Sequence, residues 1–176
     1  MIAGATELPL VWGATPDERQ RPYPADSLVP SPVLMTRAVS VDAPVDVVWR
    51  WLCQIAVAPY SYDWIDNRGR RSPRELTPGA DHLEPGQTMA LVFRLTSVED
   101  GHHWTALTDP RGERLFGPVA ITYAAEPGRI VCRLAAAGGS PVRRAKAYAL
   151  AWGDLVMMRK QLLTLKELAE GTAAAG

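Results

Sequence analysis

The feature that most constrains the fold is a long proline-free stretch at the C-terminus, preceded by several short strand-like segments. Between about 148 and 170, Leu, Met, Ala, Lys and Glu dominate, which predicts one long helix ended by Gly171. The preceding segments are β-prone and bounded by turn residues; they are 85–101, 102–109, 119–128 and 129–137. An antiparallel sheet of such strands needs a cover for its apolar face, and the last helix is the long amphipathic element available. The sequence therefore predicts an α+β fold.

The N-terminal half completes this organisation. Residues 1–33 are rich in proline and predict an extended arm that lies over the domain or is partly mobile. Residues 34–41 alternate like a first strand, and residues 45–55 carry apolar residues at helical spacing. We expect a loop over 138–146, a single domain over 34–171, and a flexible tail over 172–176.

Composition and charge exclude several classes of function. The chain has 176 residues, which suits one domain, and 47% of them are hydrophobic, enough for a sizeable core. Because the formal net charge is zero, no long-range field favours nucleic acid or an anionic membrane. The N-terminus lacks a basic region, and no apolar run is long enough for a membrane span. We expect a cytoplasmic monomer or homodimer without stable membrane insertion and without a nucleic-acid partner.

The cysteines and histidines do not predict a metal site. Cys53 and Cys132 form no Cys-x-x-Cys pair, and the three histidines stand at no zinc-binding spacing from them. Each cysteine lies in an apolar segment, which is typical of reduced thiols in a core. We expect neither a metal nor an organic cofactor.

Two polar residues fall inside the apolar arc of the last helix. Projected at about 100° per residue, Asp154 and Gln161 lie among leucines and methionines. A carboxylate aimed at a core costs several kcal/mol unless it is paired or protonated. One interpretation places Asp154 near the start of the helix, stabilised by the dipole or paired with an arginine at a rim. The other makes it a polar anchor inside a ligand cavity.

Four ordered segments carry a resemblance to a known family. They are VDAPVDVVWRWL, PYSYDWIDNRGR, LEPGQ and GDLVMMRKQLLTLKELAE. Together they resemble the START-like superfamily, also described as Bet v 1-like or as polyketide cyclase/dehydrase and lipid transport proteins, and in particular bacterial members with a YSYDW-type motif. The resemblance spans roughly residues 34–170. It implies a helix-grip fold, in which a curved antiparallel sheet wraps a long C-terminal helix and leaves an apolar cavity between them. It implies no catalytic residue set that maps onto this chain.

The stretch YSYDWIDN, residues 60–67, allows two interpretations. In the structural one, Trp64 fills the core and Asp63 caps a helix. In the functional one, Tyr60 or Tyr62 presents its hydroxyl to a ligand carbonyl and Asp63 acts as an acid or base. The arginine-rich loop that follows is either a solvated loop or a gate for anionic ligands.

The strands offer further candidates. Arg94 and Arg133 lie mid-strand, and an inward-pointing arginine there would be the natural partner of Asp154. Either His103 or Trp104 should face the interior, because neighbouring strand residues point to opposite faces. The alanine-rich ends AITYAA and LAAAGG either widen a cavity or mark strands that fray.

Three hypotheses for function remain open. The first is the binding of a small hydrophobic ligand, such as a polyketide, isoprenoid or lipid-like molecule, between sheet and helix. The second is a cofactor-independent enzyme of the polyketide cyclase, aromatase or dehydratase type. The third is an interaction module whose cavity is filled by its own side chains. The candidate acid–base residues are Asp154, Tyr62 and Asp63. The candidate ligand-binding residues are Tyr60, Trp64, Arg94, His103, Trp104, Tyr123, Arg133, Leu150, Met157, Met158 and Gln161.

Overall fold

The chain forms one sheet that lies against a long C-terminal helix. The computed structural model describes residues 5–62 and 71–175. Its elements, in chain order, are β1 (Ala5–Glu7), β2 (Val11–Ala14), α1 (Pro16–Gln20), α2 (Pro24–Leu28), β3 (Pro32–Ser40), α3 (Val45–Cys53), the 3-10 turn η1 (Gln54–Ala56), β4 (Thr88–Met89), β5 (Phe93–Glu99), β6 (His103–Thr108), α5 (Pro110–Phe116), β7 (Val119–Glu126), β8 (Arg129–Ala137) and α6 (Pro141–Ala175).

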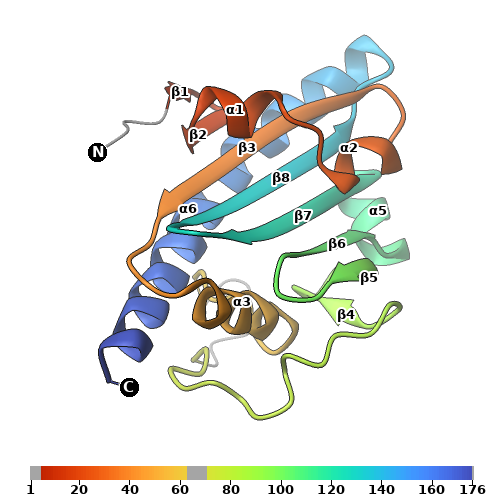
Figure 1. Cartoon of the computed structure of the whole chain (residues 1–176). Coiled ribbons are helices and arrows are strands. Elements are labelled where there is room, and N and C mark those ends of the chain that lie inside the picture. Colours follow the sequence, from red (N-terminus) through yellow and green to blue (C-terminus); the bar gives the residue numbers. More distant parts are fainter. Residues whose placement is uncertain (1–4, 63–70, 176) are drawn as a thin grey trace.

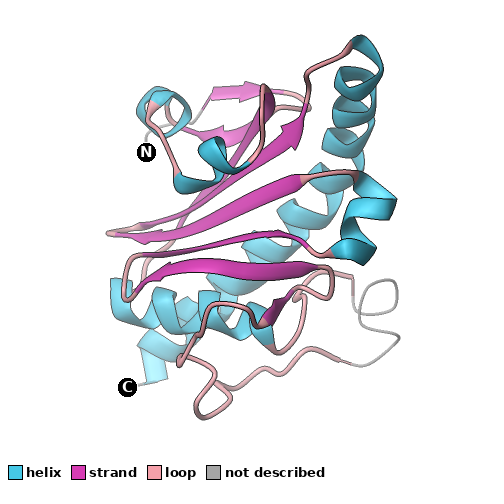
Figure 2. Cartoon of the chain, turned by 90° about the vertical axis from the view of Figure 1, so that its right-hand side faces the viewer, coloured by secondary structure: helices cyan, strands magenta, loops and turns pink. Residues whose placement is uncertain are grey.

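The sheet is curved and mostly antiparallel. Its eight strands run in the order β1-β2-β3-β8-β7-β6-β5-β4, and the pairing of β2 with β3 is parallel. Figure 1 shows α6 passing behind the sheet while α1 and α2 lie in front of it. Figure 2 shows this layering from the side, with α5 on the same side as α6. This is the helix-grip arrangement that the resemblance implied, so the α+β fold prediction is confirmed.

The last helix is longer than the sequence suggested. It spans 35 residues and begins at Pro141, where Ser140 Oγ accepts a hydrogen bond from the Arg143 amide at 3.3 Å. Proline suits a first helical position because its missing amide hydrogen would have no helical partner there. The helix also continues through Gly171, and Trp51 Nε1 donates to Thr172 Oγ1 at 3.0 Å. The loop expected over 138–146 is therefore wrong from Pro141 on, and so is the stop at Gly171.

The central strands are buried on both faces. On β7, Ile121 and Tyr123 face α6 and the main core, whereas Ala120 and Ala124 face the N-terminal arm. Every residue of β7 from Val119 to Ala125 is buried, and the strand is paired along its whole length with β8. These alanine-rich strands therefore do not fray. Alternation puts small side chains on the outer face, where the helices of the arm contact the sheet.

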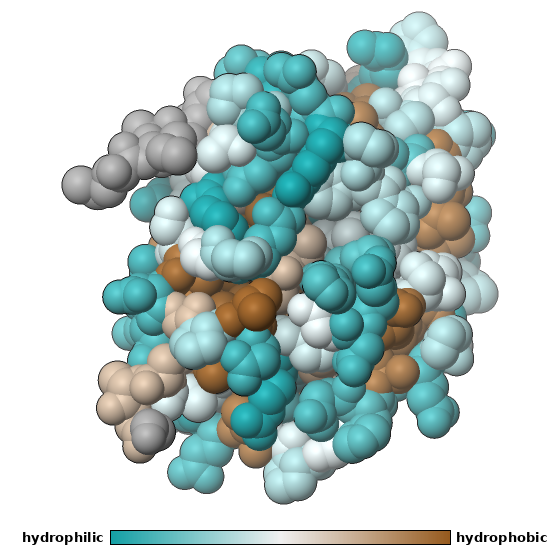
Figure 3. All heavy atoms as spheres, in the orientation of Figure 1, coloured by the Kyte–Doolittle hydropathy of each residue, from teal (hydrophilic) through white to brown (hydrophobic). Residues whose placement is uncertain are grey.

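The N-terminal arm is folded onto this outer face. Arg133 Nη2 donates to three arm carbonyls, those of Glu18, Arg19 and Arg21, at 3.2, 2.7 and 3.0 Å. Its guanidinium also lies 4.8 Å from the ring centroid of Tyr23. Figure 3 shows this face, which is largely hydrophilic with smaller hydrophobic patches. The arm thus adds two strands and two short helices to the fold, while the domain boundary at residue 33 stays a prediction.

Two further expectations from the sequence concern the burial of the cysteines and the length of the helices. Cys53 and Cys132 are both buried and form no disulfide, as expected for core thiols. In residues 5–62 and 71–175, the helices are too short or too polar to cross a bilayer.

Candidate ligand-binding cleft

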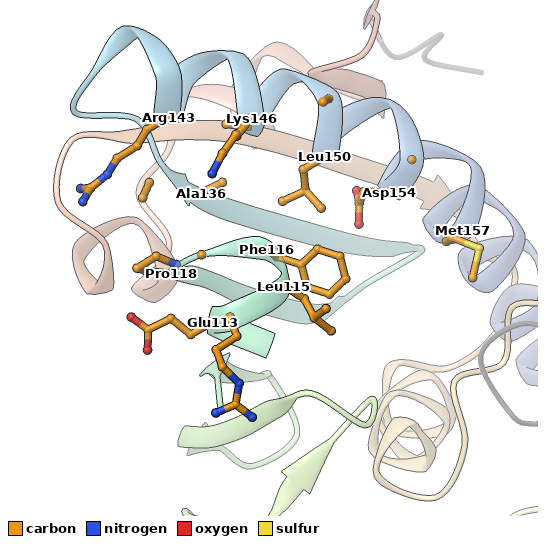
Figure 4. A pocket seen from close by; sticks show the side chains of 16 residues that line it. Glu113, Leu115, Phe116, Pro118, Ala136, Arg143, Lys146, Leu150, Asp154 and Met157 are labelled. Atoms are coloured by element: carbon orange, nitrogen blue, oxygen red, sulfur yellow. The ribbon is translucent and has the colours of Figure 1, made fainter. Parts of the chain in front are cut away.

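A cleft of about 900 Å³ lies between α5 and the N-terminal half of α6. Leu115, Phe116 and Pro118 form one wall, and Leu150 and Met157 on α6 form the other. The ends of the alanine-rich strand β8, Ala136 and Ala137, also line it. Figure 4 shows the Phe116 ring on the α5 side of the cleft, across from Leu150 and Asp154 of α6. The cleft therefore has mostly apolar walls, and the small residues of β8 leave room between them.

Helix α5 is positioned by its N-cap. Asp109 Oδ1 accepts hydrogen bonds from the amides of Arg111 and Gly112 at 2.9 and 2.8 Å, which satisfies two otherwise free donors. The helix then carries Leu115 and Phe116 at its C-terminal end, where they are 70% and 48% exposed. Large apolar side chains gathered at an open cleft are typical of a site that another molecule covers. The sequence analysis did not predict this helix.

The cleft has charged groups at two places along α6. Arg143 and Lys146 lie near the start of α6, and Glu113 and Arg114 of α5 also line the cleft. Asp154 lies further along α6, and Figure 4 shows its carboxylate pointing into the cleft from the same side of the helix as Lys146 and Leu150. Along α6, two cationic side chains thus stand at one end of the cleft and the carboxylate of Asp154 stands further along.

Asp154 faces a buried arginine. Its Oδ2 lies 3.5 Å from Arg37 Nη2; the Arg37 side chain is fully buried and that of Asp154 is 13% exposed. Arg37 donates to the carbonyl oxygens of Leu10, Thr36 and Ala151 at 2.7, 3.3 and 3.3 Å. Burial raises the pKa of the Asp154 carboxyl to about 6, although Arg37 acts to lower it. Asp154 can therefore exchange a proton near neutral pH.

The interior beyond Asp154 is filled by a polar network. Tyr123 Oη donates to Gln161 Oε1 and lies 3.2 Å from Met158 Sδ, and Gln161 Nε2 donates to the Pro59 carbonyl at 2.6 Å. Burial raises the pKa of the Tyr123 hydroxyl well above its ordinary value, with Cys132 and Asp154 adding to the effect. Because these groups are occupied with one another, the interior next to Gln161 is packed, and neither Tyr123 nor Gln161 lines the cleft.

The structure brings together only part of the predicted site. Asp154, Leu150 and Met157 line the cleft, while Met158 and Gln161 face the packed interior. Their roles in ligand binding stay predictions. Placing Asp154 near the helix start is wrong, because α6 begins thirteen residues earlier, at Pro141.

The strand candidates divide between the two faces of the sheet. Trp104 faces inwards, stacks on Tyr123 with a centroid distance of 4.6 Å, and donates to the Leu52 carbonyl. Arg133 lies under the arm on the opposite face, so the partner of Asp154 is Arg37 and not a mid-strand arginine at 94 or 133. Side chains two residues apart on a strand share a face, so Arg37 of β3 lies on the same face as Met35, a core residue on the side of α6.

Two other candidates on the strands lie away from the cleft. Arg94 is exposed and donates to the Gly86 carbonyl at 2.9 Å. His103 lies on the strand face opposite to that of its neighbour Trp104, with Nδ1 3.5 Å from Glu99 Oε2. Neither residue lines the cleft between α5 and α6.

The YSYDWIDN stretch is only partly within the described residues. Tyr60 is buried, has φ 55°, and meets Trp51 edge to face with ring centroids 6.0 Å apart. Tyr62 lines a separate surface depression together with Trp12 and Leu163. Asp63 and Trp64 lie outside the described residues. The tyrosines are therefore not at the cleft that contains Asp154.

The cleft residues that the sequence analysis missed lie on α5 and on the first turns of α6. Asp109-Pro110 and Ser140-Pro141 each place a capping side chain directly before a proline, and this pattern is a helix-start signal. This pattern in the sequence is consistent with helices that begin at Pro110 and Pro141. Among residues 5–62 and 71–175, no cluster of His, Cys, Asp and Glu is suited to holding a metal ion.

Comparisons with known proteins give structural neighbours only. The chain is similar to the crystal structure of protein MLL2253 from Mesorhizobium loti, with 16% identity, coverage of 80% of this chain and 98% of that one, and a TM-score of 0.46. It is similar to the di-domain ARO/CYC BexL from the BE-7585A biosynthetic pathway, with 18% identity, coverage of 79% and 50%, and a TM-score of 0.44. It is also similar to Ara h 8.0201, with 9% identity, coverage of 83% and 100%, and a TM-score of 0.45. No family model matches the chain, and no curated protein matches it.

Proposed function

We propose that this chain, which has the helix-grip fold of START-like proteins, binds a small apolar ligand in the cleft between α5 and α6. The ligand class that we infer is polyketide, isoprenoid or lipid-like. The observation that supports the proposal is the cleft itself, with exposed Leu115 and Phe116 on one wall and Leu150 and Met157 on the other. Its volume of about 900 Å³ is in the range of small-molecule sites. An open cleft favours ligand binding over an interaction module with a filled interior.

The experiment measures the binding of a neutral apolar fluorophore, N-phenyl-1-naphthylamine, to the purified protein. Leu150→Trp fills part of the cleft with a bulky indole ring. We expect the lost space to weaken fluorophore binding about 10-fold, or about 1.4 kcal/mol. Val156→Trp is the matched control, because Val156 is on the same helix, is exposed and does not line the cleft. Equal affinities of both variants and the parent would refute the cleft as the binding site. Native mass spectrometry of freshly purified protein then identifies any copurified ligand.

A second candidate function is acid–base catalysis, and the Asp154–Arg37 pair is the observation that favours it. A carboxyl whose pKa is raised to about 6 by burial is matched to proton transfer near neutral pH. In such a step, the Asp154 carboxylate takes a proton from the carbon next to a ligand carbonyl, and the electron pair of the C–H bond forms an enolate. Arg37, 3.5 Å from Asp154, then balances negative charge at the inner end of the cleft.

Exchange of hydrogen for deuterium at the α-carbon of 2-dodecanone, followed by NMR in heavy water, tests this second candidate. We expect the parent protein to accelerate exchange over buffer and Asp154→Asn to lose that acceleration while it still binds the fluorophore. Unchanged exchange in Asp154→Asn would remove this carboxyl from the catalytic candidates. Tyr62→Phe serves as the control, because Tyr62 lines a different depression.

A further inference from the structure

The cleft presents unlike polar groups at its two ends. Arg143 and Lys146 stand near the start of α6, and Asp154 stands eleven residues after Arg143. At a rise of 1.5 Å per residue, this is about 16 Å along the helix. Resting on the proposed function, we propose that the ligand is an anionic amphiphile about 16 Å long, with its acidic head at Arg143 and Lys146 and a hydroxyl at Asp154.

The head end favours a carboxylate or a phosphate. Both charged side chains that α6 presents to the cleft at this end, Arg143 and Lys146, are cationic, while Glu113 and Arg114 of α5 offset each other in charge. The first turn of α6 contains no acidic residue, so the positive end of the helix dipole adds to the attraction. Figure 4 shows Arg143 and Lys146 extending from α6 over the cleft. A neutral or cationic head would gain nothing from this arrangement.

The inner end favours an uncharged hydrogen-bond donor. Asp154 Oδ2 is buried and has no hydrogen-bond partner among the described residues, because Arg37 at 3.5 Å is beyond good hydrogen-bond geometry. Oδ2 faces Arg37, so a ligand hydroxyl would donate to the carboxylate from the cleft side, where Figure 4 shows it, and would help to offset the cost of its burial. A second acidic group at this end would be repelled. The walls between the ends are apolar, which suits a hydrocarbon or polyketide body.

The distance between the ends sets the probe. An extended chain advances about 1.2 Å per bond, so 16 Å corresponds to about 13 bonds. The molecule 12-hydroxydodecanoate has a carboxylate and a hydroxyl at nearly this separation. Dodecanoate lacks the hydroxyl, and 1,12-dodecanediol lacks the charge. Isothermal titration calorimetry with these three compounds, at pH 8 and at low and high salt, separates the contributions of the two ends.

The variant Arg143→Gln/Lys146→Gln removes the cationic head site. We expect it to weaken 12-hydroxydodecanoate about 3- to 10-fold and to leave the diol unchanged, since exposed ion pairs contribute modestly and are screened by salt. The matched control is Arg144→Gln/Lys160→Gln, which removes two cations of the same helix that do not line the cleft. We expect Asp154→Leu to abolish the preference for 12-hydroxydodecanoate over dodecanoate.

The outcomes distinguish the two proposals. If no probe binds, the proposed ligand-binding function is overturned. If the diol and the hydroxy acid bind equally, with no effect of salt or of the double variant, the anionic head is overturned while ligand binding stands. If the hydroxy acid keeps its advantage over dodecanoate in Asp154→Leu, the assignment of the hydroxyl end is overturned. Weaker binding of the hydroxy acid in the matched control, equal to that in the cleft variant, would show a diffuse surface effect and would also overturn the head site.

Discussion

Asp154→Asn tests whether burial or the neighbouring Arg37 has the larger effect on the pKa of the Asp154 carboxyl. Burial raises its pKa in the folded protein to about 6, from 3.8 without burial. Between these two values the unfolded chain has already released the proton and the folded chain still holds it. The free energy of unfolding therefore falls as the pH rises through this window, and the loss is complete above the folded pKa. Asparagine does not titrate, so the variant should not show this loss.

The magnitude follows from the shift. A difference of about 2 pKa units corresponds to about 3 kcal/mol, and most of it falls between pH 4 and pH 7. Because the Asp154 side chain is only 13% exposed, solvent screening reduces this value little. Urea denaturation of the parent and of Asp154→Asn at pH 4, 5, 6 and 7 measures the difference in unfolding free energy. We expect the parent to lose about 2 to 3 kcal/mol relative to the variant over this range.

The test uses only how the difference in unfolding free energy between parent and variant changes with pH, because an effect of the amide that is the same at every pH cancels. A difference that stays flat, or that moves in favour of the parent as the pH rises, would refute the reasoning. It would mean that the attraction of Arg37, at 3.5 Å, outweighs the burial of Asp154. The carboxyl would then be an ordinary ion-pair partner, and the case for proton transfer at the cleft would fall.

Three substitutions probe other parts of the fold. Arg37→Met should cost about 3 to 5 kcal/mol at pH 7, because it leaves the Asp154 carboxylate without its cation, and the loss should shrink at pH 4; equal losses at both values would contradict this. Arg133→Met removes donors to three arm carbonyls and should cost about 2 to 4 kcal/mol while fluorophore binding is kept; limited proteolysis should then cut in the arm first. Gly13→Ala places a Cβ 2.2 Å from a backbone oxygen, whereas Gly79→Ala meets nothing within 4 Å at a similar positive φ. Thermal melting should show a larger loss for Gly13→Ala, and similar losses would refute the steric argument.

The sequence was sufficient to predict a sheet covered by the last helix and to predict which residues of α6 point inwards. Periodicity alone places Asp154 and Gln161 on that face, and both point away from bulk solvent in the structure. The partner of Asp154 was predicted at Arg94 or Arg133, on strands later in the chain, and not at Arg37. On β3, however, strict alternation puts Arg37 on the same face as the core residue Met35. A buried arginine is tolerated there because three carbonyl oxygens accept its hydrogen bonds.

The extent of the cleft was harder to predict. Its position depends on α5 and on the first turns of α6, and both come from capping residues before a proline. Such short signals are easily interpreted as turns, since Asp, Ser and Pro are also typical of loops. Whether Tyr123 faces open space or a partner depends on the three-dimensional meeting of β7 with Gln161, 38 residues away. Local patterns contain no information about that meeting.

The parallel pairing of β2 with β3 has a consequence for shortened forms of the protein. Strand β3 has β8 on one side, and on the other it is covered by Val11 and Trp12 of the arm. A fragment that starts at β3 would leave the backbone amides and carbonyls on that edge of β3 without their partners in β2. Unsheltered edges of this kind recruit strands from other molecules. The N-terminal arm would then protect the chain against self-association. A shortened protein without the arm would need another element to cover this strand edge.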